Sequence, residues 1–223
     1  MDKLKGARYF SKFDIWWGYN NVRVWSGDEW KAAFKTNWGL YKPTVMFFGM
    51  CNSLVTFQAM MDKIFKKEIE GYFIIVYIND VLGFSKTINR LKKIKWIVLK
   101  KAREHDLFFK PKKCKFRKQK IKYLGLVVQE GKLAMDSTKL KGIMEWPTPK
   151  TVKEVQSFLG FVDFYWQFIK NFSHLAHPLN DLLKKDKKFI WSKECQESFD
   201  LLKKRFTEEP VLMMPDHTKL FQI

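Results

Sequence analysis

The chain contains few cysteines, and they are too scattered to form a recognisable metal site. Cys51, Cys114 and Cys195 make no Cys-x-x-Cys pair and lie in no cluster with histidine at the spacing of zinc ligands. An odd number of widely separated cysteines is typical of buried thiols in a reducing compartment. The sequence therefore gives no support for a zinc site.

Long apolar segments are also missing. No stretch approaches the roughly 18–20 apolar residues that a membrane-spanning helix needs. The first residues, Met1 to Lys5, lack the apolar region of a signal peptide. We expect an intracellular protein, cytoplasmic or nuclear, that has no membrane partner.

Acidic residues are scarce: 23 Asp and Glu stand against 42 Lys and Arg, a net charge of +19. A protein this basic usually binds a polyanion, because phosphate contacts release counterions. The alternative is a solvated, lysine-rich surface. The lysines concentrate over residues 90–122, and those of 110–122 alternate with Pro, Cys and Phe. This second stretch is the better candidate to lie along a phosphate backbone.

The composition, 46% apolar and 17% aromatic, is that of a folded protein. Apolar alternation predicts a hairpin over 73–84 and short strands at 9–15, 21–25, 32–36, 108–109, 122–128 and 133–134. Helical spacing predicts helices at 52–69, 87–105, 136–145, 151–169, 178–184 and 193–206. The fold class is therefore α+β, with a domain boundary near 135–150.

Two short acidic segments form the candidate site. Asp14 ends the first predicted strand, and Asp80 lies at the turn of the hairpin, in Tyr77-Ile78-Asn79-Asp80. Carboxylates from neighbouring strands can hold two metal ions about 3.5–4 Å apart for an in-line displacement on a phosphate. That chemistry favours two aspartates at the turn, and here the first of them is Asn79.

An ordered series of motifs around these segments resembles the reverse transcriptases of gypsy-type LTR retrotransposons, especially the fungal branch. The matching motifs cover essentially the whole chain and lie at 5–14, 18–23, 27–31, 47–49, 56–61, 84–87, 123–125, 145–149, 157–160, 178–182 and 209–212. The resemblance implies a pol polyprotein fragment with a right-hand polymerase fold. It implies palm and partial fingers over 1–135, a helical thumb over 136–185, and the start of a connection/RNase H-like region over 186–223.

The resemblance also implies roles for individual residues. Asp14 and Asp80 match metal-binding carboxylates, so two Mg²⁺ ions are the implied cofactors. Four residues match the nucleotide pocket: Tyr19, Phe48, Gly49 and Lys113. Three match the strand that grips the primer end: Tyr123, Leu124 and Gly125. The implied partners are an RNA or DNA template with a DNA primer, and deoxynucleoside triphosphates.

The chain departs from the family at Asn79, which occupies the position of a catalytic aspartate that bridges both metals. A neutral amide is a weaker ligand for a hard cation and offsets none of its charge. We expect polymerisation to be slowed by roughly three orders of magnitude or more, since several kcal/mol of electrostatic stabilisation are involved. Two alternatives are a non-catalytic, basic nucleic-acid-binding remnant and an unselected product that folds poorly.

Overall fold

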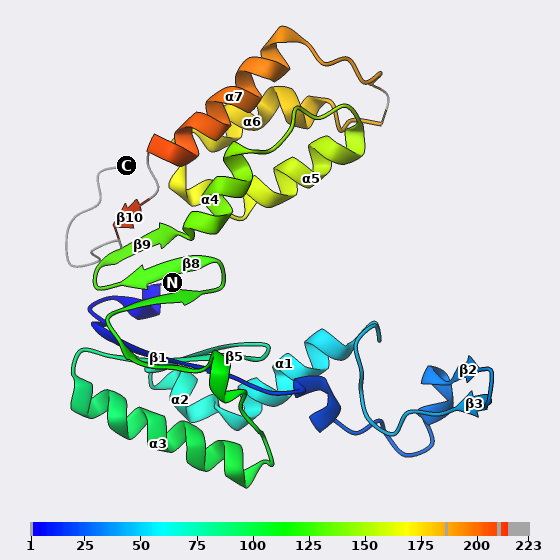
Figure 1. Cartoon of the computed structure of the whole chain (residues 1–223), viewed down its shortest axis with the longest axis vertical. Helices are drawn as coiled ribbons and strands as arrows, with labels where there is room; N and C mark the ends of the chain where they lie inside the picture. Colours follow the sequence, from blue (N-terminus) through cyan, green and yellow to red (C-terminus); the bar gives the residue numbers. More distant parts are fainter. Residues whose placement is uncertain (1, 186, 209–210, 214–223) are drawn as a thin grey trace. The chain divides into compact units, whose positions relative to one another are not determined.

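The computed structural model describes residues 2–185, 187–208 and 211–213 of the chain (Figure 1). These residues form two compact units. Unit 1 comprises Met1–Tyr123 with Gln129–Gly131, and unit 2 comprises Leu124–Val128 with Lys132–Ile223. The assignment of palm, thumb and connection to the ranges 1–135, 136–185 and 186–223 stays a prediction.

Unit 1 is built on a four-stranded sheet with the order β4-β5-β1-β6. Its strands are β1 (Tyr9–Asp14), β4 (Ile74–Tyr77), β5 (Asp80–Ser85) and β6 (Lys115–Lys118). The pairs β4·β5, β5·β1 and β1·β6 are antiparallel. Because β1 and β5 are the central strands, they are rich in buried residues, and their register places Phe13 opposite Val81 and Asp14 opposite Asp80.

Three helices cover one face of this sheet: α1 (Ser53–Ile64), α2 (Lys66–Glu70) and α3 (Ile88–Glu104) (Figure 1). Thr87 caps α3 by accepting a hydrogen bond from the backbone N–H of Arg90. The residues of α3 that are buried recur every three or four positions, as an amphipathic helix requires: Leu91, Ile94, Val98 and Ala102. Most of them join Phe13 and Val81 in a single core cluster.

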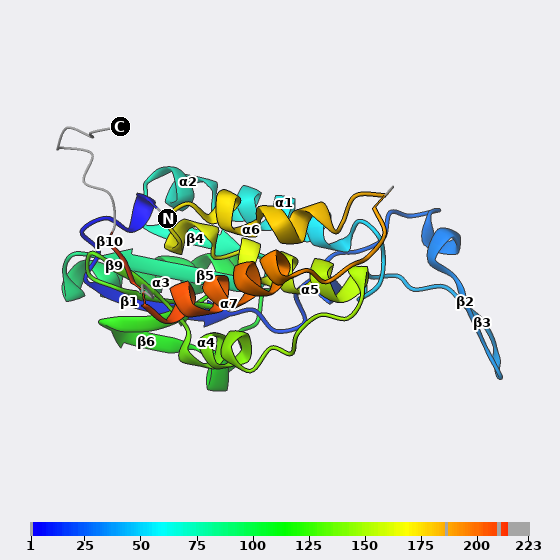
Figure 2. The same ribbon diagram turned by 90° about the horizontal axis from the view of Figure 1, so that it is seen from above.

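An extended arm separates β1 from α1. It contains the short 3-10 helices Gly18–Asn21 and Glu29–Ala32 and a ribbon of two strands, β2 (Phe34–Thr36) and β3 (Gly39–Tyr41). Figure 2 shows this ribbon projecting away from the helices of unit 1. All six tryptophans of unit 1 are exposed, and all of them except Trp96 belong to the arm: Trp16, Trp17, Trp25, Trp30, Trp38 and Trp96.

The remaining elements of unit 1 carry lysines. They are the 3-10 helices Asp2–Leu4 and Pro111–Lys113 and the strand β7 (Lys120–Tyr123). In β7 the side chains alternate, so that Ile121 and Tyr123 are buried while Lys120 and Lys122 are exposed.

Unit 2 combines strands β8 (Leu126–Gln129), β9 (Lys132–Met135) and β10 (Val211–Met213), in the order β10-β9-β8, with four helices. The helices are α4 (Ser137–Met144), α5 (Val152–Asp163), α6 (Phe172–Asp181) and α7 (Lys193–Glu208), and a 3-10 turn, Trp166–Phe168, follows α5. Asp136 and Thr151 cap α4 and α5 through their side chains. Phe158 of α5 packs against Phe199 of α7 with ring centroids 4.6 Å apart.

The sequence patterns misplace several boundaries. Residues 21–25 are not a strand, since Arg23 makes only an isolated bridge to Val45. The predicted helix over 52–69 breaks at Phe65 into α1 and α2, and the predicted strand over 122–128 is interrupted by a turn at Leu124 and Gly125. The helix expected at 178–184 is instead α6, which begins earlier, at Phe172. Pro178 is predicted at the start of this helix but lies inside it.

Within the described residues, no helix has both the length and the apolar composition that crossing a bilayer requires.

Candidate functional site

The β4–β5 hairpin brings the two predicted carboxylates together. Tyr77 pairs with Asp80, which leaves Ile78 and Asn79 as a two-residue turn. The register of β1 on β5 then sets Asp14 directly opposite Asp80. Ile78 has a φ of 50°, which a first turn residue needs but a β-branched side chain rarely adopts. The turn is therefore strained and depends on contacts from elsewhere.

Gln58 of α1 supplies one such contact. Its side-chain oxygen accepts a hydrogen bond of 2.6 Å from the backbone N–H of Ile78. Its amide nitrogen donates to Asp62, at 2.8 Å. In the sequence, Gln58 is only one residue of a family motif, and no role for it is predicted. The one feature that could have indicated a role is that this polar side chain directly follows the buried Phe57 in α1.

Each of the two carboxylates has a lysine partner. Lys12 Nζ lies 2.9 Å from Asp80 Oδ1, and these side chains are only 19% and 22% exposed. Lys113 Nζ lies 3.7 Å from Asp14 Oδ2. The sequence patterns do not predict the first ion pair, although Lys12 and Asp14 are two residues apart on β1 and so point to the same face.

These residues line a cleft of about 780 Å³ that we call the lysine cleft. Its charged residues are two aspartates and seven lysines, namely Asp14, Asp80, Lys12, Lys112, Lys113, Lys115, Lys118, Lys120 and Lys122. The lining thus carries five net positive charges. The basic stretch over 110–122 supplies most of them.

Asn79 is not among the residues that line the lysine cleft. Its backbone carbonyl accepts a hydrogen bond of 2.8 Å from the N–H of Ile15. Its side-chain oxygen is buried and has no hydrogen-bond partner among the described residues. That oxygen lies against Gly18, where an added Cβ would meet it and would also come within 2.6 Å of the Phe57 ring. The amide is therefore directed into the protein, towards Gly18.

The donor set is short of what a pair of divalent cations requires. Two carboxylates face each other, both are paired with lysines, and the third position is a neutral amide turned towards Gly18. Among the described residues, no group of three or more His, Cys, Asp or Glu side chains is placed to hold a metal ion. Asp14 and Asp80 are the residues that would bind a cation, but they do not fit two.

The residues predicted for the nucleotide pocket fall into two places. Tyr19 is buried and packs edge-to-face against Phe48, with ring centroids 4.8 Å apart, and against Phe57. Burial raises the pKa of Tyr19, and Tyr77 adds to this. Phe48 itself is 80% exposed, and Gly49 follows with a φ of 102°. Lys113, in contrast, lies in the lysine cleft.

The residues predicted to grip the primer are split by the division into units. Tyr123 is buried in unit 1, and its hydroxyl donates to the backbone carbonyl of Asp80 at 3.4 Å. Burial raises the pKa of Tyr123, and the nearby Asp80 and Tyr77 raise it further. Leu124 and Gly125 begin unit 2 as a turn with positive φ rather than as a strand. There, the carbonyl of Gly125 accepts a hydrogen bond from Tyr165.

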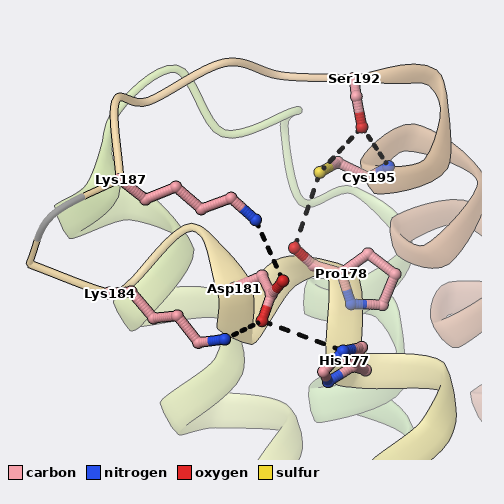
Figure 3. A network of polar contacts seen from close by, with 7 residues as sticks. All are labelled: His177, Pro178, Asp181, Lys184, Lys187, Ser192 and Cys195. Carbon is pink, nitrogen blue, oxygen red and sulfur yellow. Dashed lines mark hydrogen bonds and ion pairs between the residues drawn. The ribbon is translucent and has the colours of Figure 1, made fainter.

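Unit 2 contains a second polar cluster, at the end of α6 (Figure 3). Asp181 is held by Lys184 at 2.8 Å and by Lys187 at 3.0 Å. These hydrogen bonds lower the pKa of Asp181 to about 2. Nearby, the buried thiol of Cys195 donates to the carbonyl of Pro178, at 3.7 Å. The hydrogen bond from Cys195 to Pro178 joins α7 to α6.

Comparisons with known proteins agree with this architecture. Residues 1–128 match the family described as reverse transcriptase (RNA-dependent DNA polymerase). The Tf2-3 and Tf2-7 transposon polyproteins of Schizosaccharomyces pombe are 31% and 30% identical over 219 residues, which is 98% of this chain. The chain spans 16% of the length of these polyproteins.

Among solved structures, a foamy viral protease-reverse transcriptase in complex with an RNA/DNA hybrid aligns with a TM-score of 0.80 at 24% identity, over 91% of this chain and 28% of that one. The same viral protein in complex with dsDNA aligns with a TM-score of 0.80 at 24% identity, over 94% of this chain and 44% of that one. These likenesses confirm the predicted polymerase fold. The chain belongs to the reverse transcriptase family, in the branch of the LTR retrotransposon polyproteins.

Proposed function

We propose that this chain is a reverse transcriptase domain that binds a template with its DNA primer and whose DNA synthesis is impaired by Asn79. The partners would be an RNA or DNA template, a DNA primer and deoxynucleoside triphosphates. Nucleic-acid binding is supported by the structural neighbours, which are complexes with an RNA/DNA hybrid and with dsDNA. It is also supported by the positive lining of the lysine cleft.

The impairment is inferred from the three residues at the family's metal-binding positions, Asp14, Asn79 and Asp80. Asn79 presents a neutral amide whose oxygen lies against Gly18, and the carboxylates of Asp14 and Asp80 are paired with lysines. Mg²⁺, when bound in this family, offsets the charge that develops on the transferred phosphate. Only two carboxylates are here to hold it, so we expect weak Mg²⁺ binding and synthesis slowed by about three orders of magnitude.

Primer extension by the purified chain tests this proposal. The original sequence and the Asn79→Asp variant would be compared on a primed RNA template with Mg²⁺. We expect the variant to extend the primer about a thousandfold faster or more. The double variant Asn79→Asp/Asp14→Asn is the control, and it should be as slow as the original because it again has two carboxylates. Equal rates for the original chain and Asn79→Asp would refute the impairment.

A second candidate is a nucleic-acid-binding module without catalysis. The observation that favours it is the lysine cleft, since its charge does not depend on the identity of residue 79. Binding of the hybrid by both the original chain and Asn79→Asp, with no extension by either, would support this candidate over the first.

A further inference from the structure

The lysine cleft has the charge of an anion site and not that of a cation site. Seven lysines and two aspartates line it. Of the lysines, four have an ammonium group that makes no ion pair or hydrogen bond with a described residue: Lys112, Lys115, Lys118 and Lys120. Their ammonium groups are donors that only water or a bound anion can satisfy.

Local structure directs several of these lysines to one surface. On β7, alternation buries Ile121 and exposes Lys120 and Lys122 together. The adjoining strand β6 is exposed along its whole length, from Lys115 to Lys118. The result is a row of ammonium groups on extended backbone, which is an arrangement that can follow successive phosphates of a nucleic-acid strand.

The two aspartates of the cleft are already neutralised by the chain itself. Asp80 has Lys12 at 2.9 Å, and Asp14 has Lys113 at 3.7 Å. A divalent cation would have to displace these ammonium groups and would then face the other five lysines of the lining. For the same reason, a phosphate entering the cleft meets no uncompensated carboxylate.

We propose that the lysine cleft binds the phosphodiester backbone of a nucleic acid directly on its lysines, with Lys12 and Lys113 serving as built-in counter-cations in place of divalent metal ions. Binding is then independent of Mg²⁺. This inference rests on the proposed function for the identity of the ligand, and it adds the mode of recognition. It predicts that affinity and DNA synthesis have different metal requirements.

The test measures the affinity of the chain for a fluorescent RNA/DNA hybrid as a function of salt, in EDTA and in Mg²⁺. Affinity in EDTA should be at least equal to that in Mg²⁺, because Mg²⁺ only competes for the phosphates. The variant Lys118→Gln/Lys120→Gln should flatten the plot of log affinity against log salt by about two units, about one for each lost phosphate contact.

A matched control lies on the outer face of α3. Lys92→Gln/Lys93→Gln makes the same change in net charge at two exposed residues outside the cleft. It should leave the slope unchanged. The proposal is overturned if EDTA lowers the affinity by about tenfold or more and Mg²⁺ restores it. It is also overturned if the control variant and the cleft variant flatten the slope equally.

A second measurement addresses the counter-cations and needs no nucleic acid. Mn²⁺ binding, followed by electron paramagnetic resonance, should be barely detectable in the original chain and at least about tenfold tighter in Lys12→Met/Lys113→Gln, which uncovers both carboxylates. Lys113→Gln alone, at an exposed side chain, repeats the test without disturbing the sheet. Equally tight Mn²⁺ binding by the original chain and by both variants would overturn the proposal.

The two proposals fail in different experiments. Rapid primer extension by the original sequence would refute the impairment, while equal affinity in EDTA and in Mg²⁺ would still support direct binding of phosphates by the lysines. A different outcome would refute the binding mode alone. In that outcome, Asn79→Asp extends primers and the original chain does not, but the affinity for the hybrid requires Mg²⁺.

Discussion

The hydrogen bond from Ile78 to Gln58 is the contact that holds the turn of the β4–β5 hairpin, and Gln58→Leu removes it. The substitution deletes the oxygen that accepts from Ile78 N–H at 2.6 Å. It leaves a partly buried donor unpaired, which costs about 1–3 kcal/mol. Because Ile78 already has a strained φ of 50°, the turn is expected to relax once this contact is lost.

Amide hydrogen exchange along β4 and β5 measures this effect. A loss of about 1–3 kcal/mol corresponds to exchange that is roughly 5- to 150-fold faster in these strands. Asp62→Ala is the matched control, because it removes a different hydrogen bond of Gln58, at 2.8 Å on the surface, and should change stability by no more than about 0.5 kcal/mol. If Gln58→Leu leaves exchange unaltered, or if Asp62→Ala has an equal effect, Gln58 does not hold the turn.

Two further predictions concern packing and charge. Gly18→Ala should destabilise unit 1 by about 1–3 kcal/mol, since its Cβ would overlap Asn79 and lie 2.6 Å from the Phe57 ring. Gly160→Ala, where nothing lies within 4 Å in the middle of α5, should instead be neutral or stabilise by up to about 1 kcal/mol; urea unfolding compares the two, and equal losses would contradict the packing described. Asp181 has a folded-state pKa of about 2, below the value near 4 of an unfolded chain, so its contribution to stability is present above about pH 4 and lost as the pH falls towards 2. The difference in unfolding free energy between the original chain and Asp181→Asn should therefore be constant near neutral pH and vanish in acid, and a difference independent of pH down to 2 would refute this.

Local signals in the sequence locate part of the fold correctly. Thr87 before a run of apolar residues every three or four positions predicts α3, and the caps Asp136 and Thr151 predict the starts of α4 and α5. The break at Phe65 escapes prediction because this aromatic residue continues the apolar face of α1, so the periodicity gives no sign that the helix ends there.

The site divides in the same way. The facing of Asp14 and Asp80 follows from a hairpin motif and a neighbouring strand, both of which are readable in the sequence. The pairing of Lys12 with Asp80 depends on the register between β1 and β5, which sequence patterns do not specify. The direction of the Asn79 side chain depends on the space beside Gly18, a feature that appears only in three dimensions.

The exposed tryptophans of unit 1 determine how the protein can be followed in solution. Because all six indoles of that unit are already exposed, its unfolding should barely alter their emission. Unit 2 differs, since Trp146 and Trp191 are partly covered and pack against Phe158 and Phe199. A blue-shifted fluorescence signal that disappears on heating would report the melting of unit 2 alone, while circular dichroism would record both.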